Sequence, residues 1–432
     1  MAKFWALAAG AAAMATGAAA QEAPVTFIHA GRLLATPGEA ARGPSTVIVR
    51  DGKIAEVRGG HVAPEAGAEV VDLRDKFVLP GLIDMHVHLY SSGYPLKERM
   101  EGPLTDREDA FVTAMANARK TLHAGVTTVR DLGSPHPRGI RALRDAIARG
   151  EVEGPTVVNA GRMISVTAGH GDANALREEY AHAVRTEADH LCNGPEECRR
   201  ATREQIFTGA EVIKFAASGG VGSNIAGGLG AQMTLDEMKA IVDTAHSFGR
   251  KVTAHAHGAD AIKLALRAGV DSVEHASYID DETVRLFKQT GAYLVPTNHA
   301  FESVIRQSRA GERPPATMAK AEQVALVVKD SHRRAYAAGV KVAMGTDSGV
   351  GPHGTNGLEF GYMVANGLSP TLAIRAATVD AAELLGRSDR IGRIAAGMDA
   401  DIIAVDGDPL ADVRSLEDVD FVMKRGKVVK AD

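Results

Sequence analysis

The chain has 432 residues, of which 45% are hydrophobic and only 4% aromatic, and its formal net charge is −5. This length is enough for one large domain and one smaller domain, with cores built mainly from aliphatic side chains. Acidic and basic residues are interspersed. Because a nucleic-acid partner usually leaves a basic stripe on a protein, the charge pattern argues against one.

The first 20 residues differ from the rest of the chain. Lys3 precedes an apolar stretch rich in alanine and glycine, and Ala18-Ala19-Ala20 supplies the small residues of a cleavage site. The pattern predicts a secretory signal peptide over residues 1–20, cleaved near Ala20, and a periplasmic or secreted protein. A membrane anchor is the alternative. The segment is short and no second apolar span follows it, so we expect no stable membrane insertion.

Residues 21–79 and 390–432 share a pattern of short alternating strands. Asp51-Gly52 lies between two alternating runs, which is a strong hairpin signal. The same style returns in DADIIAVDGDPL and VDFVMKRGKVVKAD near the C-terminus. We therefore predict that the two chain ends join into one small β-sandwich domain.

Between them, over residues 80–389, apolar β-branched runs alternate with helical segments. The runs are LIDMHVHL, GVTTVRDLG, PTVVNAG, EVIKFAAS, KVTAHAHG, DSVEHAS, AYLVPTN and KVAMGTDS. Eight strand–helix units predict the α/β class and a (β/α)8 barrel, enlarged by loop insertions. A doubly wound open sheet is the alternative, but it does not explain where the polar residues fall.

Several helix boundaries are also predicted by local signals. Thr105 with Glu108, and Thr234 with Glu237, have the spacing of capping boxes. Glycines at 125, 209 and 249 fall where helices should end.

Polar side chains gather at the predicted carboxyl ends of the barrel strands, which face the mouth where active sites of this fold lie. They are His86, His88, Lys214, His255, His257, His275 and Asp347. Each has a structural alternative: Lys214 as a salt-bridged lysine, His275 as a core histidine, Asp347 as a helix cap. Seven such residues in one barrel favour a metal site. The spacing of His86 and His88 puts both imidazoles on one face of a strand.

Cys192 and Cys198 are the only cysteines. Asn193-Gly194-Pro195 resembles a helix entry with Pro195 at the first helical position, which places Cys198 about one turn into the helix, within reach of Cys192. An exported chain with two nearby cysteines favours a disulfide. Zinc ligation is the rival interpretation, but there is no second cysteine pair.

These motifs resemble the amidohydrolase superfamily, and within it the imidazolonepropionase-like and prolidase-like members. The resemblance covers nearly the whole chain after residue 20, from VLPGLIDMHVHL through SVEHAS and GTDSG to IGRIAAGMDADIIAVDGDP. It implies that His86, His88 and Asp347 bind one Zn²⁺, that His255 and His275 bind a second, and that a carboxylated Lys214 bridges them. Some relatives hydrolyse dipeptides or N-acyl amino acids, including the amide of ochratoxin A.

The chemistry of this ligand set is hydrolytic. Imidazole and carboxylate suit zinc, although another divalent ion is an alternative. Carbon dioxide would turn the neutral Lys214 amine into a carbamate with two anionic oxygens, able to span two metals about 3.5–4 Å apart. We expect a metal-bridging hydroxide to attack an amide carbonyl, and Asp347 to move the proton to the leaving nitrogen.

The remaining polar candidates are expected to contact the substrate. His257 shares the inward face with His255 but is one ligand too many. His170 resembles the family's TGGHG-like segment, and Tyr278 and Ser91 are weaker candidates. Support of the loops and metal ligands is the alternative role for all four. The glycine-rich stretch Ser218–Gly230 lacks the ending of a phosphate loop and is predicted to be a mobile flap.

The favoured function is a binuclear zinc amidohydrolase that releases a C-terminal amino acid, as a carboxypeptidase or Xaa-Pro dipeptidase does, with ochratoxin A as one possible substrate. Hydrolysis of a cyclic amide with one metal, as in imidazolonepropionase, is the alternative, and a non-catalytic metal-binding barrel is the third. Relatives are often oligomeric, some octameric, so a homo-oligomer is expected, although a monomer fits the composition as well.

Overall fold

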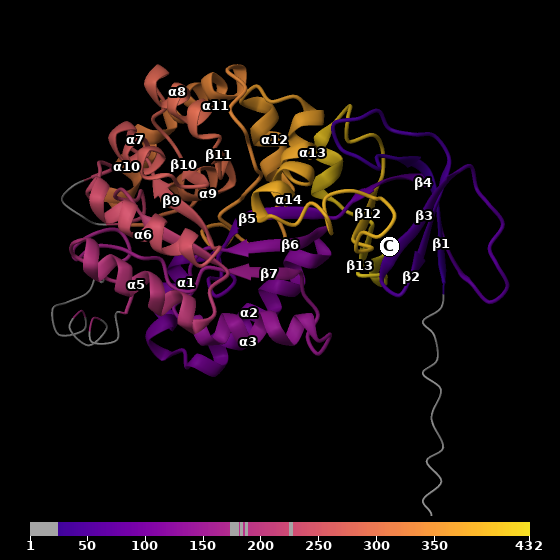
Figure 1. Cartoon of the computed structure of the whole chain (residues 1–432), viewed down its shortest axis with the longest axis horizontal. Coiled ribbons are helices and arrows are strands. Elements are labelled where there is room, and N and C mark those ends of the chain that lie inside the picture. The colour runs from indigo at the N-terminus through magenta and orange to yellow at the C-terminus, as the bar shows by residue number, and fades with distance from the viewer. Residues whose placement is uncertain (1–24, 173–180, 182–184, 186–188, 224–227) are drawn as a thin grey trace, which may run out of the picture.

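The computed structural model describes residues 25–172, 181, 185, 189–223 and 228–432, so the predicted signal peptide lies outside the described residues. Figure 1 shows two parts side by side: a body of strands surrounded by helices, and a smaller sheet domain. Within the described ranges, no helix combines the length and apolar character needed to cross a bilayer.

The smaller part is one seven-stranded sheet built from both chain ends. In spatial order its strands are β14 (Lys427–Ala431), β13 (Phe421–Lys424), β12 (Ile402–Val405), β4 (Glu69–Pro80), β1 (Thr26–Leu33), β2 (Ser45–Arg50) and β3 (Lys53–Gly59). The two chain ends meet where β12 pairs with β4. The sheet is curled: β3 and β13 lie near its opposite edges, yet Ile54 of β3 and Phe421 of β13 belong to the same buried cluster. The expected composite β-domain is confirmed; its predicted limits stay a prediction.

Two tight turns close the hairpins at either end of this sheet. Asp51 and Gly52 have φ angles of 49° and 73° between β2 and β3, and Arg425 and Gly426 have φ angles of 46° and 78° between β13 and β14. Positive φ at both central residues is the turn that matches strand twist. The two turns abut, since a Cβ on Gly426 would lie 2.8 Å from the Cα of Gly52. The hairpin predicted at Asp51-Gly52 is confirmed.

The larger part is a barrel of parallel strands. Three strands form one sheet, β5 (Leu82–Val87), β6 (Val126–Asp131) and β7 (Thr156–Asn159). Four form the other, β8 (Val212–Ala216), β9 (Lys251–Ala256), β10 (Ser272–His275) and β11 (Tyr293–Val295). On one side the sheets are linked by the Glu211 N–H, just before β8, which donates to the carbonyl of Asn159 in β7, and Ile164 of the intervening loop bridges to Phe215 of β8.

Residues 341–348, predicted as the eighth strand, join the sheets on the other side without forming a regular strand. Val342 bridges to Leu294 of β11, and Ser348 bridges to Val87 of β5. The ladder is interrupted because Met344 donates its N–H to Ala376, outside the barrel sheets, and because Asp347 has a positive φ of 57°. The barrel prediction is confirmed, with this seam in place of a complete eighth strand.

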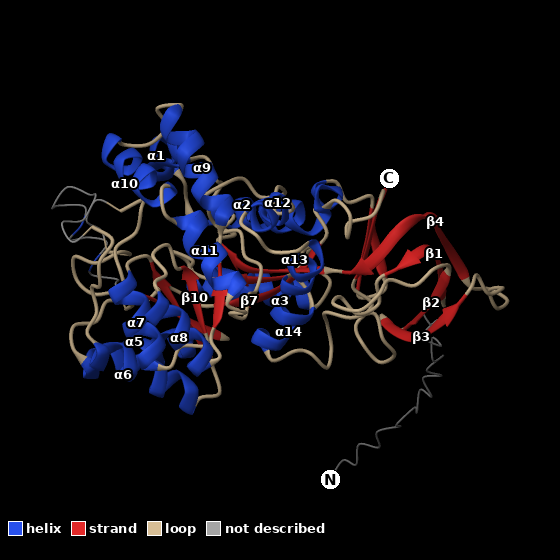
Figure 2. Ribbon diagram, turned by 90° about the horizontal axis from the view of Figure 1, so that it is seen from above, coloured by secondary structure: helices blue, strands red, loops and turns tan. Residues whose placement is uncertain are grey.

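Helices surround the barrel strands, as Figure 2 shows in blue around red. They are α1 (Pro95–Glu101), α2 (Arg107–His123), α3 (Pro137–Ala148), α5 (Pro195–Thr208), α6 (Leu235–Ser247), α7 (Ala259–Ala268), α8 (Asp281–Thr290), α9 (Asn298–Arg309), α10 (Pro315–Ala325), α11 (Val328–Ala337), α12 (Leu358–Ala365), α13 (Pro370–Ala376) and α14 (Val379–Leu385), with 3-10 turns η1 (Gly102–Leu104) and η2 (Val413–Glu417).

One predicted capping box is confirmed and the other is wrong. Thr234 and Glu237 exchange side-chain to backbone hydrogen bonds at the start of α6. Thr105 does not cap α2, which begins after Asp106, because the Thr105 hydroxyl donates backwards to the carbonyl of Glu101 across the preceding 3-10 turn. The predicted glycine ends are confirmed: positive φ angles of 85°, 103° and 66° follow α2, α5 and α6 at glycines 125, 209 and 249.

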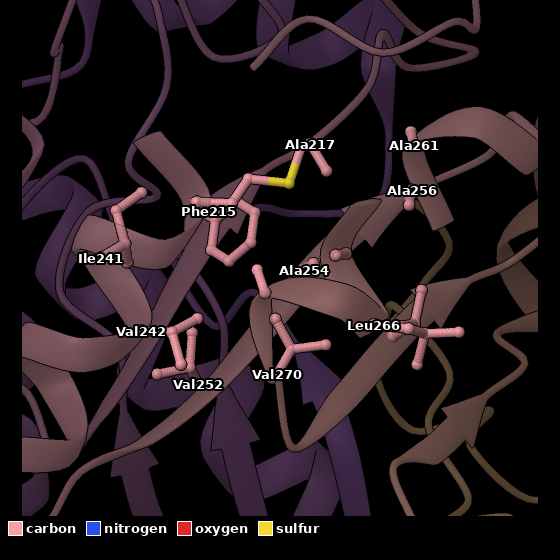
Figure 3. Close-up of a cluster of buried hydrophobic side chains, with 14 of the residues drawn as sticks. Phe215, Ala217, Ile241, Val242, Val252, Ala254, Ala256, Ala261, Leu266 and Val270 are labelled. Carbon is pink, nitrogen blue, oxygen red and sulfur yellow. The ribbon is translucent and has the colours of Figure 1, made fainter. Parts of the chain in front are cut away.

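The main core lies between the barrel strands and the helices outside them. Figure 3 shows part of this cluster, to which Phe215 of β8, Ile241 of α6, Val252 of β9 and Leu266 of α7 all belong. Most members of this cluster are Ala, Val, Ile or Leu, as the low aromatic content predicts. Alanines on β9 allow close approach of the surrounding side chains, which keeps the sheet and helix layers tight.

A disulfide joins Cys192 to Cys198, with the two Cα atoms 4.9 Å apart. Both cysteines are fully buried, and Pro195 starts α5 as predicted. The bond ties the loop before α5 to the first turn of the helix. The disulfide interpretation is therefore confirmed and the zinc-ligand alternative is not.

Candidate metal centre

The strand β5 delivers the first half of the centre. His86 and His88 point to the same face at its carboxyl end, as the two-residue period requires. The seam places Asp347 against them: its Oδ1 lies 3.2 Å from Nε2 of His88 and 3.5 Å from Nε2 of His86. These three residues form one group able to hold a metal ion.

The second half comes from β9 and β10. His255, His257 and His275 offer nitrogens within 4.8 Å of one another. The His257 ring stacks on His275 with a centroid distance of 5.0 Å, and His255 meets His275 edge-on at 4.6 Å. His257 was expected to contact the substrate and not a metal. It nevertheless belongs to the same group as the two predicted ligands, His255 and His275.

Lys214 of β8 lies at the same place in the barrel interior. Its Nζ is 3.3 Å from Nε2 of His86, and the residue is only 1% exposed. Burial lowers the pKa of Lys214 to about 8, against the opposing effect of Glu274 and Asp347. A neutral amine is therefore accessible near neutral pH, and a neutral amine is the form that can react with carbon dioxide.

Each imidazole of the two groups has one nitrogen engaged by the protein. Nδ1 of His86 donates to Glu274 at 2.8 Å, Nδ1 of His88 donates to the Gly133 carbonyl at 2.9 Å, and Nε2 of His255 donates to the Gly219 carbonyl at 3.3 Å. Nδ1 of His257 and His275 meet hydroxyls, each at 2.7 Å. Such contacts fix the ring orientation and leave the other nitrogen for a metal.

Burial also sets the charge of these rings. It lowers the pKa of His86 to about 4 and that of His257 to about 3, and it lowers the pKa of His255 and His275 well below the usual value. These rings are neutral at pH 7, the form that binds metals. His88 is the exception: burial opposes its charge, but the nearby Asp347 carboxylate raises its pKa.

These residues fit a pair of divalent cations. Asp347 is 7% exposed, and none of the described residues aligns a donor with its buried Oδ1. Two ligand atoms of a tetrahedral zinc site, each about 2.0–2.2 Å from the metal, lie about 3.3–3.6 Å apart. The separations of 3.2 and 3.5 Å between Asp347 and the histidine nitrogens match that spacing. Burial alone would raise the pKa of Asp347, but His86, His88 and Lys214 hold it below its usual range.

Two further buried residues support the centre and were not predicted. Glu274, fully buried in β10, accepts from His86 with one oxygen and from Arg130 of β6 at 2.7 Å with the other. Arg130 is 1% exposed and also donates to the carbonyl of Met85 at 2.7 Å. Because β6 and β10 lie opposite each other, this ion pair spans the barrel interior beneath the ligands.

A cavity of about 800 Å³ opens above the ligands and contains all six predicted metal ligands in its lining. Its walls also carry Arg107, Arg162 and Arg313, with Phe301 and Val304 on the apolar side. The centre is thus placed at the bottom of a pocket that offers cationic groups to a substrate.

Of the predicted substrate contacts, His170 and His257 line this cavity and Tyr278 and Ser91 do not, among the residues that the structure describes. The His170 and His255 rings are tilted by 31° with centroids 4.2 Å apart, and a Cβ on Gly220 would lie 2.5 Å from the His170 ring. Tyr278 packs into an apolar cluster with Val304 instead. Part of the predicted flap, residues 224–227, lies outside the described residues.

Comparisons with known proteins agree with this arrangement. The Amidohydrolase family model matches residues 77–429. The ochratoxinase of Aspergillus niger is 34% identical over 435 residues, covering 96% of this chain and 88% of that protein.

Solved structures give the same result. A Xaa-Pro dipeptidase with bound methionine in the active site has a TM-score of 0.88 and 37% identity, covering 94% of this chain and 100% of the dipeptidase. A prolidase complexed with N-methylphosphonate-L-proline has a TM-score of 0.85 and 31% identity, again covering 94% and 100%.

Proposed function

The chain belongs to the amidohydrolase family and is a hydrolase of amide bonds similar to ochratoxinase and prolidase; we propose that it removes a C-terminal amino acid from dipeptides or N-acyl amino acids. The observation that carries the proposal is the convergence of the six predicted metal ligands and three arginines in one cavity. A free carboxylate on the substrate suits the arginines, because a guanidinium pairs with a carboxylate through two parallel hydrogen bonds.

The donor set supports two divalent cations, with zinc favoured by its imidazole and carboxylate content. His86, His88 and Asp347 would hold one, His255 and His275 the other, and a carbamate on Lys214 would link them. When bound, such cations polarise a carbonyl and bring the pKa of water to about 7, which supplies a nucleophile at neutral pH.

The protein's own side chains would handle the proton and the substrate. The Asp347 carboxylate, kept ionised by the histidines around it, accepts a proton at an oxygen and passes it to the leaving nitrogen. His257 and His170 line the cavity beside the ligands, where their neutral rings can hydrogen-bond the substrate carbonyl and the charge that develops on it.

Asp347→Asn tests the proton role. The variant should keep a share of its metal and lose at least about 100-fold in kcat, as expected for removal of a general base. A metal-loaded Asp347→Asn protein with full turnover would rule out Asp347 as the proton carrier.

The function itself is tested by a mass-spectrometric hydrolysis screen with and without a chelator. The panel contains dipeptides ending in Pro, Met, Phe, Lys or Arg, N-acyl amino acids including ochratoxin A, and cyclic amides. Chelator-sensitive release of a C-terminal amino acid supports the proposal and identifies the preferred residue. The proposal is contradicted if only cyclic amides are hydrolysed, or if the metal-loaded protein hydrolyses none of the compounds.

Export and assembly complete the proposal. The signal-like residues 1–20 and the disulfide between Cys192 and Cys198 both suit an oxidising compartment. N-terminal sequencing of the protein from the periplasmic or secreted fraction should begin at or near residue 21. Sedimentation of this mature form tests the expected homo-oligomer, and a monomer mass would contradict it.

A further inference from the structure

A second cavity of about 710 Å³ lies beside the metal centre, among helices α2, α3 and α5. We propose that it is the subsite for an elongated apolar acyl group, so that the favoured substrates are N-acyl amino acids with long-chain or extended aromatic acyl groups. The inference rests on the proposed function for the orientation of the substrate, and it adds which part of the molecule determines selectivity.

The second cavity is adjacent to the ligands. It shares a wall with the metal cavity, made of Arg107, Pro135, His136 and Arg162. Arg107 is exposed, so this part of the shared wall lies at the protein surface. An elongated group can therefore extend from one cavity into the other across Arg107. Tyr90, which lines the second cavity, follows the ligand His88 by only two residues. A substrate held at the metal centre is therefore next to this cavity.

The second cavity combines exposed apolar side chains with charged residues whose signs balance. Phe111, Val112 and Phe207 line it, and Val112 and Phe207 are 63% and 73% exposed. Exposed apolar side chains gathered around a hollow usually indicate a binding site. Its basic residues and its acidic residues number three each: Arg107, Arg138 and Arg162 against Glu108, Asp189 and Glu204. This cavity therefore suits a neutral apolar group rather than an ion.

The floor of the cavity is fixed by a close contact. The Tyr90 hydroxyl approaches the backbone of α3 so closely that a Cβ on Gly139 would lie 2.2 Å from it. The Tyr90 ring also meets His136 edge-on, with a centroid distance of 5.4 Å. Since Gly139 leaves this space, the aromatic floor is present before a ligand arrives, which lowers the ordering cost of binding.

The carboxylate end of the same substrate has a separate place. Arg313 lines the metal cavity but not the second cavity. Its Nε donates to Gln307 at 2.7 Å, which orients the guanidinium, and its tip lies near Gly222. A carboxylate at Arg313 and an acyl group beyond His136 place the amide between them, over the metal ligands.

The test uses sulfonamide analogues that cannot be hydrolysed, N-methylsulfonyl-L-proline and N-dodecylsulfonyl-L-proline, titrated into the metal-loaded protein by calorimetry. The dodecyl compound should bind at least tenfold more tightly than the methyl compound. Substituting the exposed pair, V112A with F207A, should remove most of that advantage and leave the methyl compound unaffected. Phe248→Ala is the matched control, because Phe248 is 52% exposed and lines neither cavity.

Equal affinities for the two compounds, or an advantage that survives V112A/F207A, would overturn the inference. So would a change of sedimentation mass in V112A/F207A without loss of dodecyl affinity, because the patch would then be a contact between copies of this chain. The hydrolysis screen is read separately: chelator-sensitive cleavage of dipeptides with no effect of acyl length leaves the proposed function standing and removes only this subsite.

Discussion

At the scale of single residues, Glu274 connects the barrel interior to the metal ligands. Its carboxylate accepts from His86 and from Arg130, and it also accepts from the hydroxyls of Thr253 and Ser272. Because Nδ1 of His86 donates its hydrogen to Glu274, Nε2 is the only nitrogen of this ring that is available to a cation. Glu274 is therefore a positioning residue, although it does not itself reach the cavity lining.

Glu274→Gln should weaken metal binding about 10–100-fold, the usual effect of removing a ligand's supporting carboxylate. The glutamine amide is uncharged and has only one oxygen, so it cannot accept hydrogen bonds from both His86 and Arg130 as the carboxylate does. The His86 ring would then lose its fixed orientation. Metal affinity is measured by competition with a chromophoric chelator. Glu383→Gln, at an exposed ion pair with Lys341, is the control. Unchanged affinity in Glu274→Gln would show that His86 is oriented without Glu274.

Lys214 gives a second prediction at this scale. Lys214→Met keeps a buried side chain of similar length but cannot carry a carbamate. The metal content of the purified protein should fall by at least one equivalent per chain, measured by inductively coupled plasma mass spectrometry. Lys341→Met changes an exposed lysine and should keep full content. Two equivalents retained by Lys214→Met would contradict the bridging role.

At the scale of elements, α9 and α12 are held together by a buried carboxyl. Glu359 of α12 is fully buried and accepts from the backbone N–H groups of Asn298 and His299 and from the Asn298 amide. Asn298 in turn contacts His332, whose Nε2 donates to the carbonyl of the ligand His275. The packing of α9 and the position of His275 are thereby linked.

Burial raises the pKa of Glu359 from 4.5 to about 8, against the opposing effect of its N–H donors. The folded chain then holds a proton that the unfolded chain releases, so the contribution of Glu359 to the free energy of unfolding falls as pH rises from about 4.5 to about 8 and is constant outside that window. The steepest slope is about 1.4 kcal/mol per pH unit. Thermal unfolding midpoints across this range should fall less in Glu359→Gln than in the unmodified chain. Parallel profiles would contradict a protonated Glu359.

The same scale shows what the sequence predicts and what it does not. The strand period placed His86 and His88 on one face, and the barrel pattern placed Asp347 at the same mouth, because both depend on local alternation and on strand direction. The seam at 341–348 differs from a strand because its hydrogen bonds go partly to Ala376, far along the chain. Local pattern cannot reveal such a partner.

Glu274 and Arg130 were not predicted, although the sequence carried a local signal for both. A glutamate and an arginine inside the apolar runs DSVEHAS and GVTTVRDLG were a usable signal, since two opposite charges buried in one barrel must meet. Thr105 misled because its spacing was right but its hydroxyl bonds backwards to the Glu101 carbonyl. Tyr278 packs in the cluster around Val304, and its substrate contact stays a prediction.

At the scale of the whole molecule, bound metal should contribute to global stability, because the ligands come from β5, β9, β10 and the seam and so tie opposite sides of the barrel together. Removing metal with a chelator should lower the thermal unfolding midpoint by several degrees. A ligand at 1,000 times its Kd adds about 4 kcal/mol to stability. Calorimetry with and without re-added zinc measures this. An unchanged midpoint would mean that the barrel holds its shape without the ions.

The seam also determines when the site can exist. Asp347 meets His86 and His88 only after some 260 intervening residues are in place, and β4 finds its partner β12 later still along the chain. Contacts this distant in sequence form late in folding. During synthesis, a chain that ends before Asp347 already contains His255, His257 and His275 but lacks the carboxylate of the group formed by His86, His88 and Asp347. We therefore expect a complete pair of cation sites only in the full-length chain, and a product truncated before Asp347 would keep the three-histidine group alone.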